Sequence, residues 1–163
     1  TTNFIFSPDL IARLSQVPHI AGVKMPLPGN GDFAGELANL RSRTPEGFVI
    51  GYSGDWGAKD SLLAGGDTWF SVVAGLLPVP ALRLTRAAAS GNTQKATQID
   101  EAFSALWALF KEFGSFRVMY ALANLLDGSR IEPMRPVQPL TSDVRLKVQA
   151  ALDAFHESIA SLE

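Results

Sequence analysis

The sequence predicts an α/β protein whose strands pair in parallel. Three short apolar runs, at residues 20–24, 48–52 and 69–73, alternate with segments of helical periodicity. The runs are almost continuously apolar, which is typical of parallel strands covered on both faces and joined by right-handed crossovers. With 163 residues, 47% of them hydrophobic and 18% charged, the chain is long enough for a substantial core.

The first helix and strand are marked by local signals. Ser7, Pro8 and Asp9 supply an N-cap, a first-turn proline and a carboxylate near the helix N-terminus. The apolar run 20–24 follows as the first strand. The turn 30–32, Asn-Gly-Asp, then caps a second helix, in which Phe33, Leu37 and Leu40 share one face.

The next strand, at residues 48–52, turns through Ser53, Gly54 and Asp55 into a helix that ends at the glycine pair 65–66. The run 69–73, Trp-Phe-Ser-Val-Val, supplies the third strand. Helices and strands therefore alternate three times along the first half of the chain.

Strand signals stop after Gly75, and helical periodicity predicts helices at 80–90, 92–113, 116–126 and 142–162. A proline-rich connector at 131–139 separates the last two. One face of the 92–113 segment repeats apolar residues that we interpret as packing: Ile99, Phe103, Leu106, Phe110 and Phe113.

Composition excludes several classes of function. The net charge of −2, with both signs interspersed, leaves no basic face for nucleic acid or an anionic membrane. The longest apolar stretch, 69–82, is interrupted by glycine and proline, so we expect no membrane span. Zero cysteines exclude disulfides and thiolate chemistry and fit a cytoplasmic protein. His19 and His156 are expected to have packing or surface roles, and no metal or cofactor is predicted.

Lys24 is the residue with the clearest chemical potential. It stands at the carboxyl end of the first strand, where ligands bind in parallel α/β folds, and the loops 53–55 and 74–76 open at the same edge. One interpretation is a solvated lysine that packs only its methylene stem. The other is a desolvated lysine whose lowered pKa lets the neutral amine attack a ketone.

Five segments together resemble the dihydrodipicolinate synthase/N-acetylneuraminate lyase family. They are Ser-Pro-Asp-Leu at 7–10, Ile-Ala-Gly-Val-Lys at 20–24, Phe-Val-Ile at 48–50 leading to Gly54 and Asp55, Leu-Ala-Gly-Gly at 63–66, and Phe-Ser-Val-Val-Ala at 70–74. The similarity extends from the first residues to about Pro80, and the helical tail agrees in order and length.

The resemblance implies the C-terminal part of a (β/α)8 TIM barrel, comprising strands six to eight and extra C-terminal helices. Residues 1–79 would be the barrel units that carry the lysine, and residues 80–163 the last barrel helix and the helical extension. The first five strands are expected upstream, so we expect the chain to begin inside a longer protein. Assembly into a homo-oligomer, a dimer or tetramer, is also implied.

By the same resemblance, Lys24 occupies the position of the Schiff-base lysine and condenses with pyruvate or a related 2-oxo acid. The resulting iminium is an electron sink for aldol cleavage, condensation or dehydration. The resemblance also gives substrate-binding positions. Thr1 falls where dihydrodipicolinate synthases proper have an arginine for the second substrate's carboxylate, and its hydroxyl argues against that specific activity. The others are Ser53, Gly54, Asp55 and Phe70.

Two of these positions have alternatives. Asp55 is either a substrate contact or a helix N-cap, and Phe70, beside the expected imine, is bulkier than the family's usual aliphatic residue. The function predicted is a class I, Schiff-base lyase or hydro-lyase acting on a small 2-oxo acid, without a cofactor. The alternatives are a noncatalytic ligand-binding or interaction protein on the same scaffold, and a small flavodoxin-like sheet that lacks a phosphate loop.

Overall fold

The computed structural model describes residues 4–162. The chain divides into two compact units, the first reaching to Phe70 and the second beginning at Ser71. The first unit contains the sheet and the second is helical.

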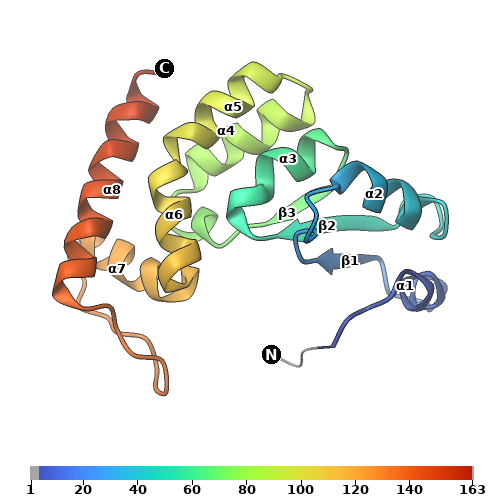
Figure 1. The fold of residues 1–163 in the computed structure, drawn as a ribbon, viewed down its shortest axis with the longest axis horizontal. Coiled ribbons are helices and arrows are strands. Elements are labelled where there is room, and N and C mark those ends of the chain that lie inside the picture. The colour runs from blue at the N-terminus through green and yellow to red at the C-terminus, as the bar shows by residue number, and fades with distance from the viewer. Residues whose placement is uncertain (1–3, 163) are drawn as a thin grey trace. The chain divides into compact units, whose positions relative to one another are not determined.

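The first unit alternates helices and strands, and its strands form a parallel sheet in the order β1-β2-β3 (Figure 1). Both the predicted alternation and the parallel pairing are confirmed. Its elements are α1 (Pro8–Leu14), β1 (Gly22–Met25), α2 (Phe33–Arg41), β2 (Val49–Ser53), the 3-10 helix η1 (Asp55–Gly57), α3 (Ala58–Leu63) and β3 (Thr68–Phe70).

Two of the predicted helix caps are present. The Ser7 hydroxyl accepts a hydrogen bond from the Leu10 backbone N–H at 3.2 Å, and the Asp32 carboxylate accepts one from the Gly35 N–H at 2.8 Å. The third expected cap is not: η1 begins at Asp55 itself, with Gly54 in the N-cap position. The helix-cap interpretation of Asp55 is therefore wrong.

The third strand is shorter than predicted. It covers Thr68–Phe70 rather than 69–73, because these three residues pair with the last three of β2, where that strand ends. The chain then turns, with the Ser71 hydroxyl accepting a hydrogen bond from the Ala74 N–H at 3.0 Å, and Val73 opens a short 3-10 helix.

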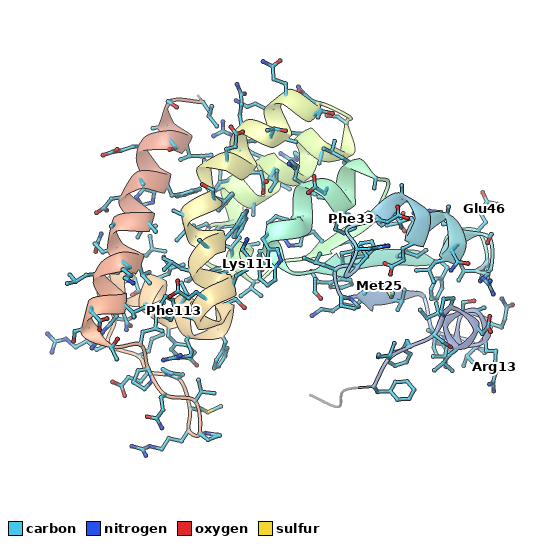
Figure 2. The ribbon with its side chains drawn as sticks, in the orientation of Figure 1. Arg13, Met25, Phe33, Glu46, Lys111 and Phe113 are labelled. Atoms are coloured by element: carbon cyan, nitrogen blue, oxygen red, sulfur yellow. The ribbon has the colours of Figure 1, made fainter. Side chains whose placement is uncertain are left out.

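The core of the first unit lies on one face of the sheet, towards α2. Figure 2 labels two of its members, Met25 on β1 and Phe33 on α2. Because side chains alternate along a strand, Val23 and Met25 face this core, whereas Gly22 and Lys24 face away. The buried members are Ile11, Met25, Phe33, Leu37, Leu40, Phe48, Ile50 and Tyr52.

Tyr52 in this core predicts a measurable effect of pH on stability. Its hydroxyl donates a 2.7 Å hydrogen bond to Glu36, and burial, with that bond, raises its pKa well above the ordinary value. The stabilisation that follows from this raised pKa is complete below pH 10. It is lost as pH rises further, because Tyr52 then ionises in the unfolded chain but not in the folded one. Above pH 10 the free energy of unfolding should fall faster than in Tyr52→Phe, by about 1.4 kcal/mol per pH unit. Urea titrations of both proteins between pH 8 and 11 measure the free energy of unfolding. The same dependence on pH in the wild type and in Tyr52→Phe would contradict the prediction.

The second unit contains the 3-10 helix η2 (Val73–Gly75), α4 (Pro78–Ala89), α5 (Thr93–Ala102), α6 (Ser104–Phe113), α7 (Ser115–Asp127) and α8 (Ser142–Ala160). The predicted single helix 92–113 is wrong, since the segment is interrupted at Phe103 and forms α5 and α6. The interruption places the Phe103 ring against Trp107 and Phe155, each with centroids 4.6 Å away. A periodic apolar pattern does not reveal such a break, because the buried residues of the two helices keep the same three- and four-residue spacing across it.

Candidate active site

Lys24 lies on the face of the sheet that the core does not cover. In the sheet register it is level with Gly51 on β2, which is level with Thr68 on β3. Ser53 and Phe70 are level with each other on the same face. On this face, Lys24 is therefore the one cation of the three strands, and Gly51, Ser53 and Thr68 are its small neighbours.

The desolvation expected for Lys24 is not provided by the described residues. Its side chain is exposed, and so are its neighbours on this face, Val49 at 38% and Phe70 at 40%. The opposite face of the same strands is covered by helices, which is why the two faces differ so strongly. Val49 and Phe70 are therefore exposed apolar side chains beside the lysine.

The Phe70 ring is the group placed over the lysine. The Lys24 Nζ atom lies 5.6 Å from its centroid, within the range of a cation–π contact. Phe70 thus lies beside Lys24 on the uncovered face of the sheet.

Lys24 also lines two clefts along β1. The larger, of about 570 Å³, runs between the segment 4–8 and the strand and has Glu36 and Leu40 among its lining residues. The smaller, of about 250 Å³, is lined by Lys24 and apolar side chains that include Phe6 and Phe48. Within residues 4–162, β1 pairs only with β2, so its other edge carries unpaired backbone groups beside these clefts.

The loop after β2 brings the other predicted residues to the same end of the sheet. The Ser53 hydroxyl donates to the Met25 carbonyl at 3.1 Å, so it has only acceptor capacity left for a ligand. Gly54 has a φ of 101°, which favours glycine, and the Leu27 side chain packs close to it. Asp55 is 1% exposed and Thr1 lies outside the described residues.

Gly51 is a feature of the site that the sequence interpretation did not single out. A glycine inside the apolar run 48–52 is the available signal, because glycine in a strand often marks a close approach of neighbouring groups. Here those groups are Thr68 and Phe70.

The described residues hold no group of three His, Cys, Asp or Glu side chains that could bind a metal ion. Nor is any helix of residues 4–162 long and apolar enough to cross a membrane.

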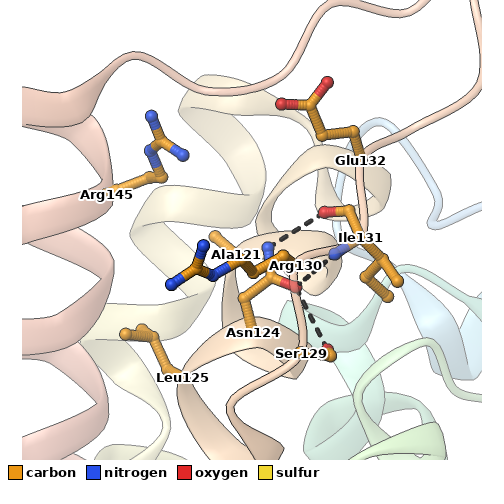
Figure 3. A pocket seen from close by; sticks show the side chains of 8 residues that line it. All are labelled: Ala121, Asn124, Leu125, Ser129, Arg130, Ile131, Glu132 and Arg145. Carbon is orange, nitrogen blue, oxygen red and sulfur yellow. Dashed lines mark hydrogen bonds between the residues drawn. The ribbon is translucent and has the colours of Figure 1, made fainter.

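A separate cavity of about 370 Å³ lies in the second unit (Figure 3). Asn124 of α7 joins its walls, donating to the Ile131 carbonyl and accepting from the Ile131 N–H, both at 2.9 Å. Arg130 and Arg145 line it with exposed side chains, opposite Glu132. The Asn124 bonds fix the start of the connector against α7.

Comparisons with known proteins give consistent matches to one family. The model of the dihydrodipicolinate synthetase family matches residues 1–155. A 4-hydroxy-tetrahydrodipicolinate synthase of Neisseria meningitidis serogroup C is 34% identical over 149 residues, covering 90% of this chain and 49% of that protein. The chain spans about half the length of such curated relatives.

Solved structures match as well. A dihydrodipicolinate synthase from Agrobacterium tumefaciens is 59% identical with a TM-score of 0.93, covering 95% of this chain and 52% of that one. The 4-hydroxy-tetrahydrodipicolinate synthase of Methylacidiphilum fumariolicum, at 22% identity and a TM-score of 0.82, shares the fold.

Proposed function

Because the chain belongs to the dihydrodipicolinate synthetase family, we propose that it is the imine-forming half of a Schiff-base lyase acting on pyruvate or a related 2-oxo acid. The observation that carries the proposal is the placement of Lys24 at the carboxyl end of β1, on the uncovered face of a parallel sheet. Ligands bind at this end of the strands in such folds.

The proposed reaction begins at the Lys24 nitrogen. The neutral amine attacks C2 of the oxo acid to give a carbinolamine. Its hydroxyl takes up a proton and leaves as water, which gives a cationic iminium. A base removes a proton from C3, and the electron pair of that C–H bond becomes the C2–C3 double bond of an enamine. The C2–N π pair returns to nitrogen, which becomes neutral. The enamine carbon can then attack an aldehyde, and the reverse sequence cleaves such a bond.

Completion of the site by upstream strands is part of the proposal. β1 and β3, as described, each pair with β2 alone, and the face that carries Lys24 is uncovered. Five further strands would close both edges into a barrel, would bury this face and would make these three strands six to eight. The match to about half of each relative supports this numbering.

The remaining predicted residues keep proposed roles. Ser53, Gly54 and Asp55 would line the mouth of the cavity, and Phe70 would form its wall beside the imine. Thr1, in place of the family's arginine, would weaken binding of a second, carboxylate-bearing substrate. A cytoplasmic location and assembly into dimers or tetramers complete the proposal.

The experiment is an intact-mass measurement of the full-length protein before and after incubation with pyruvate and borohydride. We expect one reduced pyruvyl adduct per chain, because borohydride converts the iminium to a stable secondary amine. Omission of pyruvate is the control. If a folded, full-length protein gives no adduct with pyruvate or with larger 2-oxo acids, the proposal is wrong.

A further inference from the structure

We propose that Gly51 is a positioning residue that seats the Phe70 ring over the nitrogen of Lys24. This inference rests on the proposed function, because it concerns the stability of an imine formed at Lys24. It adds a residue that has no side chain of its own and acts through its neighbour Phe70.

The first step of the argument is the sheet register. Lys24 is on β1 and Phe70 on β3, and β2 runs between them. The two side chains therefore meet above β2, where Gly51 is level with Lys24 and one row from Phe70. A side chain at position 51 would stand between them.

The second step is the space above Gly51. A Cβ atom there would lie 2.7 Å from the Phe70 Cε2 atom and 2.8 Å from the Thr68 carbonyl oxygen, and would also collide with the Thr68 methyl group. The contact with a backbone oxygen cannot be relieved by rotating a side chain. Because Gly51 is not among the glycines with positive φ, its role is to leave space rather than to allow an unusual conformation.

The third step is the effect of the ring on the reaction. An aromatic face attracts a cation but not a neutral group, so the ring 5.6 Å from Nζ stabilises the iminium relative to the enamine. Deprotonation of C3 converts the first into the second and loses this attraction. The seated ring therefore makes the iminium the favoured intermediate and slows its deprotonation.

The test measures that deprotonation per molecule of iminium in the full-length protein. Deuterium incorporation into the pyruvate methyl group in D2O gives the rate, and borohydride trapping gives the amount of iminium. Phe70→Leu removes the ring, and we expect the ratio of exchange rate to trapped iminium to rise by at least about two- to fivefold, the size of an exposed cation–π contact, because burial strengthens such a contact. Gly51→Ala should displace the ring and raise the ratio in the same direction. Normalisation to trapped iminium removes any loss of folded protein.

Gly22→Ala is the matched control, because a Cβ there would lie 2.6 Å from the Val49 carbonyl oxygen. The steric clash is similar, but Phe70 is not among the groups it would meet. Its ratio should equal that of the wild type. Equal ratios in wild type and Phe70→Leu would overturn the role of the ring. A Gly51→Ala ratio equal to that of Gly22→Ala would overturn the role of Gly51. Absence of any adduct in the wild type would instead contradict the proposed function.

Discussion

Replacement of Lys24 by alanine is expected to abolish the borohydride-stable pyruvate adduct completely. No other lysine is placed on the uncovered face of the three strands, so no other amine should form the imine. Loss of covalent catalysis should also reduce turnover by several orders of magnitude, since the iminium is the electron sink for every later step. Intact mass after reduction measures the first effect, and a coupled assay of pyruvate consumption the second.

Two variants make the interpretation of this result specific. Lys111→Ala removes an exposed lysine on α6 of the second unit and should leave the adduct at the wild-type level. Lys24→Arg keeps the positive charge and most of the length, but its guanidinium does not deprotonate in proteins and should form no adduct. An adduct that survives in Lys24→Ala would assign the imine to a different residue.

The largest expected effect on stability comes from Phe103→Ala in the second unit. The Phe103 side chain is 0% exposed; its ring stacks on Trp107 and packs at a tilt against Phe155, with both centroids 4.6 Å away. Its removal loses apolar burial and leaves a cavity where α5, α6 and α8 meet, so the free energy of unfolding should fall by about 3–5 kcal/mol.

Phe116→Ala is the comparison for this substitution. Phe116 is 51% exposed and has an edge contact with Tyr120 at 5.1 Å between centroids, so the expected loss is below about 1 kcal/mol. Urea titrations of both variants measure the difference. Similar losses would mean that the interior around Phe103 refills the space.

The helix starts that were predicted correctly depend on local signals in the sequence. Ser7 and Asp32 cap their helices because the side-chain acceptor and the N–H it receives are three residues apart. The predicted bounds of the strand 69–73 and of the helix 92–113 were wrong, because the ends of these elements depend on residues distant in the sequence. β3 stops where β2 has no further residue to pair with, and the helix breaks where Phe103 packs against α8.

For the candidate site, the family segments and the run before Lys24 identified the lysine and its place at a strand end. Neither its exposure nor its aromatic partner follows from local pattern. The exposure reflects which face of the sheet the helices of the first unit cover. The Phe70 contact reflects a parallel register that sets residues of β1 and β3 side by side across Gly51.

Residue types and their spacing were thus enough to predict the alternation of helices and strands, the family resemblance and the place of Lys24 near a strand end, because each depends on neighbours a few positions away or on a shared motif. The space above Gly51 and the ring over Lys24 depend on the tertiary structure, which sets the three strands in register. Steric exclusion between a Cβ and a ring on the next strand is a property of that register, and no short stretch of sequence contains it.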